Sequence, residues 1–380
     1  ADASSDGGQT FKLINDWTAY YKDPVHKLHA DINGIDVLDW KGKETIFLDT
    51  DGGTYMSQDG GRTVTNATLQ GFDDAEYYSS LTDPTNPDHI VAGAQDQGLQ
   101  VSRPQAGVMQ FDQVITGDRG GITSSAPDLS RIYVSSPYAI GILKVSGQSV
   151  SGLSAGFPPI RDNAFLPFLL ADPEDPNSVY VAGDHIFRMG PISGGANFPI
   201  KQLPHDFSGG HYDYLTALAI SPANHNVWYG ASVAGRLWSS HDRGATWSLT
   251  DEGSGTSNYF SATSLLPSPT DPETCYVGGS GYTFGAVQVT HDGGKTWKAV
   301  AKGLPATLVW SLAFDNAVAQ KVYAAAEAGP FVLDPATGQW TSLLDAVSPL
   351  VRYQAVESVP AAGIVRFTTY GRGIWDYQVP

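Results

Sequence analysis

The sequence has a single cysteine, few charged residues and no long apolar run. Cys275 alone cannot form a disulfide within the chain, and we interpret it as a small buried hydrophobic residue. No Cys/His spacing typical of a zinc site occurs. Because no run of about 18 apolar residues occurs, we expect no transmembrane span. The net charge of −17 also argues against nucleic acid or an anionic membrane as a partner.

Long stretches with the 3.6-residue apolar period of amphipathic helices are absent as well. The chain is instead rich in turn-forming residues, with 42 glycines and 24 prolines, and 11% of its residues are aromatic. This composition is typical of many short strands joined by turns. We therefore expect an all-β fold with little helix.

One eight-residue pattern recurs along the chain. It consists of a hydroxyl residue, any residue, Asp, any residue, Gly, any residue, Thr and an aromatic residue, and it occupies residues 4–11, 240–247 and 290–297. A copy without the final aromatic residue occupies 57–64. Because Asp bonds nearby backbone N–H groups and Gly accepts positive φ, each copy predicts the turn of a β-hairpin.

The repeated pattern resembles the Asp-box, or bacterial neuraminidase repeat. In that family the box is a structural turn on the rim of a β-propeller blade and is not catalytic. The order of motifs is also similar to the C-terminal half of large bacterial Asp-box proteins of the glycosyl-hydrolase-like and sortilin-like kinds. The resemblance therefore implies a β-propeller, with an N-terminal propeller segment of a longer precursor as one partner.

Further hairpins are predicted at residues 99–111, at 141–145 with a turn at 146–147, at 186–198 and at 331–340, which brings the total to eight. Apolar strands with Asp-Pro or Ser-Pro turns precede most of them, as at Asp83 and Asp172. Two such strands and one hairpin make a four-stranded unit of about 47 residues, the size of a propeller blade. We predict one β-propeller domain over residues 1–380 with about eight blades, seven being the alternative.

The two ends of the chain predict how the ring closes. Residues 363–377 supply inner strands of a blade without a fourth strand, and residues 10–14 supply one outer strand. We expect the N-terminal strand to join the C-terminal blade, because closure hides strand edges that otherwise invite aggregation.

Function in a propeller usually lies around the central funnel, where the second strand of each blade ends. Four aspartates near such ends are candidate catalytic residues, because glycoside hydrolysis needs two carboxylates across a cleft: Asp51, Asp96, Asp118 and Asp184. Residues expected to bind substrate beside them are His29, Asp31, Gln95, Arg119, His185, His211, Tyr282, Tyr370 and Arg372. Aromatic side chains suited to stacking on sugars or peptides include Trp17, Tyr20, Tyr21, Tyr77, Tyr78 and Phe284.

The leading hypothesis is a carbohydrate-active, glycoside-hydrolase-like propeller that cleaves or binds a polysaccharide in the funnel. One alternative is a non-catalytic propeller that binds a protein or peptide or assists assembly, as sortilin-like receptors and assembly factors do. A second is a polysaccharide lyase that uses His and Tyr as base and acid. The pattern departs from that of sialidases, because no Arg-Ile-Pro motif occurs near the start.

We expect no cofactor and no metal in the active site. A structural calcium ion bound by aspartates is compatible with the composition, although no EF-hand-type loop marks one. The start at Ala1 without a signal peptide is typical of a trimmed, secreted or periplasmic protein.

Overall fold

The computed structural model describes residues 1–72, 74–105, 108–193, 197–251, 260–283, 285–315 and 321–379. In this part of the chain the strands form nine antiparallel sheets, most of them four-stranded, which confirms the predicted all-β class. The only helical elements there are three short 3₁₀ helices: η1 (Trp17–Lys22), η2 (Thr68–Gln70) and η3 (Pro360–Ala362). No helix among the described residues is long and apolar enough to cross a membrane.

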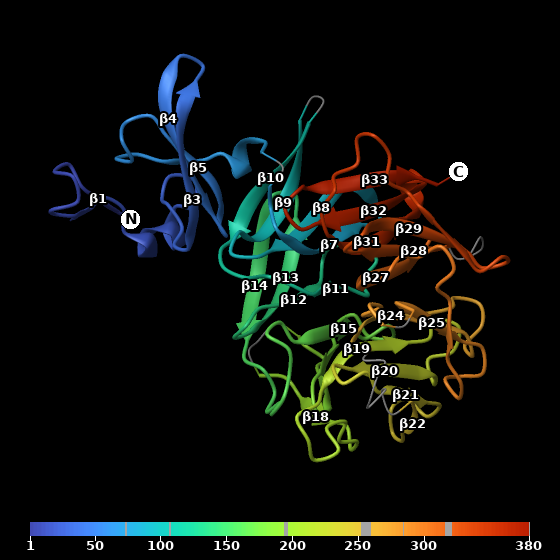
Figure 1. Ribbon diagram of the computed structural model, residues 1–380. Coiled ribbons are helices and arrows are strands. Elements are labelled where there is room, and N and C mark those ends of the chain that lie inside the picture. Colours follow the sequence, from blue (N-terminus) through green and yellow to red (C-terminus); the bar gives the residue numbers. More distant parts are fainter. Residues whose placement is uncertain are drawn as a thin grey trace.

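Seven of the sheets follow one another along the chain and pack face to face (Figure 1). In chain order their strands are β7 (Tyr77–Asp83), β8 (Asn86–Ala94), β9 (Gly98–Gln105) and β10 (Val108–Ile115); β11 (Ile122–Thr123), β12 (Ile132–Ser135), β13 (Ile140–Ser146) and β14 (Ser149–Ala155); β15 (Phe168–Ala171), β16 (Val179–Ala182), β17 (Ile186–Met189) and β18 (Ile200–Gln202); β19 (Leu215–Ile220), β20 (Trp228–Ser232), β21 (Leu237–Ser240) and β22 (Ser248–Asp251); β23 (Ala262–Pro267), β24 (Cys275–Gly279), β25 (Val287–Thr290) and β26 (Lys298–Ala299); β27 (Val309–Phe314), β28 (Val322–Ala326), β29 (Gly329–Asp334) and β30 (Gln339–Ser342); β31 (Tyr353–Val359), β32 (Ile364–Thr369) and β33 (Ile374–Gln378).

The contacts between these sheets return to their starting point. The first strands of successive sheets are in contact; for example, β15 contacts β19, and β23 contacts β27. The last sheet contacts the first through β31 and β7. Apolar side chains fill the space between neighbouring sheets; one such cluster, between the sheets of β25 and β29, contains Val287, Phe331 and Trp340. Strands such as β16, β24 and β28 are buried along their whole length, because sheets cover both of their faces.

Two sheets lie to one side of the others (Figure 1). One is a complete four-stranded sheet of β3 (Ile32–Trp40), β4 (Lys43–Thr50), β5 (Gly53–Ser57) and β6 (Thr65–Asn66). The other is the hairpin of β1 (Asp2–Ala3) and β2 (Lys12–Leu13). The helix η2 connects this region to the rest by contacting both β5 and β10.

All eight predicted hairpins are present as paired strands, from β1–β2 to β29–β30. Residues 106–107 and 194–196, within two of the predicted hairpins, lie outside the described residues. The predicted closure is wrong: β2 pairs with β1, and no strand adds to β33 among the described residues. The reason is local, because Ala1 bonds the backbone of Ile14 and Asn15, and Asn15 bonds Leu28, which holds the N-terminus on the opposite side of the molecule from the C-terminus (Figure 1).

The four copies of the recurring pattern form the same turn. In the copy after β25, Asp292 Oδ1 accepts from the backbone N–H of Thr296 at 2.9 Å and from the Thr290 hydroxyl at 2.8 Å, and Asp292 Oδ2 accepts from the Thr296 hydroxyl at 2.7 Å. These donors hold the pKa of Asp292 at about 2. Equivalent bonds form at Asp6, Asp59 and Asp242. All four aspartates are thus committed to turns, as predicted.

Candidate functional site

Three of the four predicted catalytic aspartates gather between the outlying sheet and the β7–β10 sheet. Asp51 lies in the turn between β4 and β5, Asp96 in the turn between β8 and β9, and Asp118 between β10 and β11. Asp118 Oδ1 accepts from the backbone N–H of Asp96 at 3.4 Å. The sequence separations among these residues are large, so the cluster is a product of the packing between sheets.

Gln95 and Tyr78 connect Asp51 to Asp118. Gln95 Nε2 donates to Asp51 Oδ2 at 3.4 Å. The Tyr78 hydroxyl lies 3.2 Å from Gln95 Oε1 and 3.3 Å from Asp118 Oδ1. The second Asp51 oxygen, Oδ1, accepts from Asn33 Nδ2 at 2.6 Å. Two carboxylates from different sheets are therefore positioned by one shared pair of side chains.

The backbone around Asp96 is shaped to bring these groups together. Asp96 has a φ of 53°, in the left-handed region that non-glycine residues rarely adopt. Its carbonyl accepts from the Tyr20 hydroxyl at 2.8 Å. On β8, a Cβ placed at Gly93 would lie 2.3 Å from the Arg119 carbonyl oxygen, so only glycine there lets the 118–119 segment approach this closely.

His29 lies beneath Asp96 and is fixed on several sides. Its side chain is only 4% exposed, and its Nε2 is 3.6 Å from Asp96 Oδ1. Its Nδ1 is 3.2 Å from the carbonyl of Ala30, and its ring meets the Tyr20 ring edge to face at 4.7 Å. A Cβ at Gly52 would fall 2.6 Å from His29 Cγ, so the Asp51 turn closes directly over the imidazole.

Burial and like charge dominate the electrostatics of this cluster. Burial, together with the charges of Asp118, Asp51, Asp31 and Glu76, raises the pKa of Asp96 to about 7. Burial lowers the pKa of His29 despite the nearby carboxylates, and it raises the pKa of Tyr78. The pKa of Arg119 is also lowered by burial, and its guanidinium donates to the Asp118 carbonyl at 2.7 Å.

The C-terminal sheet contributes Tyr370 to the same cluster. The Tyr370 hydroxyl bonds Gln95 Oε1, and the tyrosine pairs through its backbone with Glu76. The Arg352 guanidinium stacks 3.8 Å above the Tyr370 ring. Burial raises the pKa of both Tyr370 and Glu76. Contacts made across most of the chain length thus complete the site.

The fourth predicted catalytic residue, Asp184, has a different environment. It follows β16 and is 4% exposed. Its carboxylate accepts from the backbone N–H of Arg161 at 3.1 Å and lies 3.0 Å from Nδ1 of His185. Asp184 and His185 therefore pair with each other and tie the 161–162 segment to the β15–β18 sheet, and the structure does not bring them to the cluster.

Three other predicted substrate-binding residues lie on exposed loops. His211 lies in the loop between β18 and β19 and is exposed. Tyr282 is 57% exposed, and its hydroxyl bonds the Glu327 carboxylate. Arg372 is exposed, and its guanidinium donates to the Gly371 carbonyl at 3.0 Å. Of the predicted substrate-binding residues, those that reach the cluster are His29, Asp31, Gln95, Arg119 and Tyr370.

The aromatic residues predicted to stack on a ligand fall into a buried group and a half-exposed group. Tyr20 and Tyr77 are buried, which corrects their predicted stacking role, and Phe284 lies outside the described residues. Trp17 and Tyr21 are about half exposed on η1, with their rings 6.0 Å apart. Burial raises the pKa of Tyr21, as do the charges of Asp96, Asp31 and Asp118, so this ring borders the acidic cluster.

Sequence reasoning missed Glu76, Asn33 and Arg352 and assigned Tyr78 only to stacking. Tyr78 lies on β7, the first strand of its sheet, and Glu76 directly precedes that strand. The candidates had been sought at the ends of second strands. The first strand forms the inner edge of each sheet, so its polar residues were the available signal.

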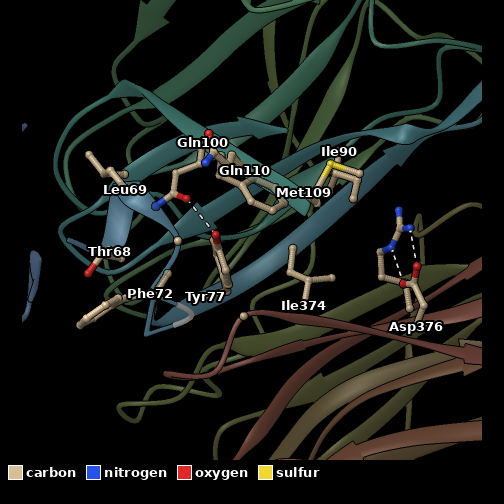
Figure 2. Close-up of a pocket in the computed structure, with 15 residues that line it drawn as sticks. Thr68, Leu69, Phe72, Tyr77, Ile90, Gln100, Met109, Gln110, Ile374 and Asp376 are labelled. Carbon is tan, nitrogen blue, oxygen red and sulfur yellow. Dashed lines mark hydrogen bonds and ion pairs between the residues drawn. The ribbon is translucent and has the colours of Figure 1, made fainter. Parts of the chain in front are cut away.

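A separate cavity of about 350 Å³ lies between η2, β10 and β33 (Figure 2). Phe72, Met109, Phe111 and Ile374 give it apolar walls. At its polar ends Tyr77 bonds Gln100, and Arg366 pairs with Asp376. None of the predicted catalytic or substrate-binding residues lines this cavity, although Tyr77, which was predicted to stack on a ligand, does. The cavity is therefore distinct from the acidic cluster.

No protein-family model and no curated protein sequence matches this chain. Solved structures do resemble it. The GH74 xyloglucanase of Xanthomonas campestris aligns with a TM-score of 0.62 and 18% identity, over 99% of this chain and 55% of that one. The GH74 enzyme of Niastella koreensis aligns with a TM-score of 0.59 and 13% identity, over 87% of this chain and 47% of that one.

A third similar structure is not a GH74 enzyme. The β-propeller domain of Cps50 (Swd1) from Myceliophteria thermophila aligns with a TM-score of 0.58 and 10% identity, over 80% of this chain and 95% of that domain. The chain spans about half the length of the two GH74 proteins it resembles. Together, the sheet arrangement and these likenesses show that the chain has a β-propeller fold.

Proposed function

We propose that this chain is a carbohydrate-active, glycoside-hydrolase-like propeller whose carboxylate pair is Asp51 and Asp118. One observation carries the proposal: both carboxylates, from different sheets, are held by the same Gln95–Tyr78 pair. Hydrolysis of a glycosidic bond uses one carboxyl group to protonate the leaving oxygen and a second to activate water or attack the sugar. The likeness to GH74 proteins supports the same reaction class.

The surroundings of the pair suit a neutral polysaccharide. The half-exposed ring of Tyr21 borders the cluster, and the half-exposed ring of Trp17 lies 6.0 Å from that of Tyr21. Both offer flat faces for sugar rings. The carboxylates of Asp31, Asp51, Asp96 and Asp118 would repel an anionic glycan. The Asp96 carboxylate lies 3.6 Å from Nε2 of the buried His29, and we assign it no part in bond cleavage.

The experiment is an activity screen on the purified chain with a panel of neutral and acidic polysaccharides. New reducing ends are expected with at least one neutral glycan, and proton NMR of the first product shows whether the anomeric configuration is inverted or retained. Binding without new reducing ends would support the non-catalytic alternative. Ultraviolet absorption of an unsaturated product would support the lyase alternative. Either result would remove the hydrolase proposal.

We also propose that the ring has seven blades and that the β3–β6 sheet belongs to a second propeller-type segment. The contacts of β31 with β7 close a circuit of seven sheets, and the β3–β6 sheet stands outside it. In the other sheets that contain the recurring turn, the turn joins the third and fourth strands, so the β1–β2 hairpin has the form of an outer hairpin without inner strands. The GH74 structures are about twice as long as this chain, and this length supports the presence of a second segment.

The surface of β3 makes this partner proposal testable. Ile35 and Val37 are 60% and 59% exposed on one face, and Leu38 and Trp40 are exposed on the other. A patch of this kind is typical of a protein interface. The double substitution Ile35→Ser and Val37→Ser is expected to reduce self-association of the isolated chain in analytical ultracentrifugation, with little change in thermal stability. A monomer that is equally soluble with or without these residues would contradict the proposal.

A further inference from the structure

Three potential ligand atoms converge on one side of the acidic cluster. They come from His29, Asp31 and Asp96, and all lie within 4.8 Å of one another. The separation between His29 Nε2 and Asp96 Oδ1 is 3.6 Å. Ligands held about 2.0–2.2 Å from a zinc-type ion lie roughly 3–4 Å apart, so only small shifts would bring the three atoms onto one ion.

The imidazole provides an independent observation that points to a ligand. His29 is 4% exposed, and its Nδ1 lies within hydrogen-bond distance of the Ala30 carbonyl, a bond in which Nδ1 must be the donor. Nε2 of the neutral ring then presents a lone pair. Among the described residues it has no hydrogen bond, and the atom it faces is a carboxylate oxygen beyond hydrogen-bond distance. A metal-binding histidine typically has this form, with the other ring nitrogen donating to a backbone carbonyl.

The two carboxylates are held in place by an uncommon backbone. Asp31 and Asp96 have φ values of 48° and 53°, and they are two of the four non-glycine residues with positive φ in the described part of the chain. Such conformations persist where the surrounding structure requires them, often at ligand sites. The Gly52 turn and the Tyr20 ring hold the imidazole in the same way.

The charges around the trio favour a cation. Carboxylates of Asp51, Asp118 and Glu76 act on Asp96 in addition to that of Asp31. The Arg119 guanidinium donates to the Asp118 carbonyl. Carboxylates this close together repel one another, and a bound cation would relieve that repulsion.

We propose that His29, Asp31 and Asp96 form a binding site for a first-row divalent metal ion of the zinc or manganese type. One imidazole and two carboxylates are a ligand set for such ions, whereas calcium prefers oxygen ligands only. The site lies beside the Asp51–Asp118 pair and does not include either residue. The inference therefore goes beyond the proposed hydrolase function, and each stands if the other fails.

The test uses the full chain after removal of metals with EDTA and exchange into chelator-free buffer. Calorimetric titration with Zn²⁺ and with Mn²⁺ is expected to show one saturable site for at least one of the two ions, with Ca²⁺ binding at least about tenfold more weakly. His29→Gln and Asp31→Asn are each expected to weaken binding about 10- to 100-fold. Asp31 is exposed, so its variant keeps the fold even if the His29 variant does not.

The matched control is His26→Gln. His26 lies three residues away, and its side chain is 63% exposed beside Asp23, so its loss is expected to leave binding unchanged. Anomalous diffraction at the metal edge is expected to place the ion between the three side chains. No saturable binding, or binding that both site variants retain in full, would overturn the proposal.

Discussion

Replacing Asp118 by asparagine is expected to lower the turnover number on a hydrolysed glycan by about 10²–10⁴-fold, the usual contribution of a positioned acid or base. The amide oxygen can still accept from the Tyr78 hydroxyl and from the Asp96 backbone N–H, so the local structure is retained. What is lost is the ability to carry or take a proton. Initial rates over a range of substrate concentrations measure the effect, and KM is expected to change little.

Asp51→Asn is expected to lower the turnover number by a similar factor, because Asp51 is the other member of the pair. The double variant is expected to lose little more than the worse single variant, since groups that act together are not additive. Asp88→Asn is the control, because Asp88 is exposed on β8 and none of the described residues is seen to bond its carboxylate. Turnover numbers within tenfold of wild type for both Asp118→Asn and Asp51→Asn would contradict the assignment of the carboxylate pair.

Replacing Arg366 by methionine is expected to cost about 3 kcal/mol of unfolding free energy, the lower end of the range for breaking a buried ion pair. Arg366 is 3% exposed, and it joins Asp376 at 2.7 Å to the Thr82 hydroxyl at 2.8 Å and the Pro87 carbonyl at 2.9 Å. These bonds cross the seam between the last sheet and the first. We use the lower end of the range because the Asp376 side chain is 41% exposed, so water can solvate its carboxylate once Arg366 is removed.

Urea denaturation followed by tryptophan fluorescence measures this loss. Arg103→Met is the matched control, since Arg103 makes a surface pair with Asp112 at 3.1 Å with both side chains more than one third exposed. Pairs of that kind contribute less than about 1 kcal/mol. Equal stabilities of the Arg366 and Arg103 variants would show that the seam does not depend on the buried network.

The candidate site was only partly predictable, and Asp184 shows why. Asp51, Asp96 and Asp184 all follow a second strand, so sequence reasoning treated them alike. Asp184 is occupied by its own neighbours, Arg161 and His185. Asp51 and Asp96 instead face groups from distant parts of the chain, Gln95 and His29. Which aspartate is free for chemistry depends on contacts between sheets, and no local pattern encodes them.

The recurring turn lies at the other extreme. Every bond of Asp292 goes to a residue within four positions along the chain, so eight residues suffice to specify the turn and its spacing predicts the hairpins. The sequence by itself therefore determined the all-β class, the eight hairpins and the structural role of the aspartates in the recurring turns. Only the tertiary structure decided that the N-terminal hairpin does not join the C-terminal sheet and that Asp51 and Asp118 share the Gln95–Tyr78 pair. The physical reason is that these outcomes rest on bonds between residues far apart in sequence, such as Tyr370 with Gln95.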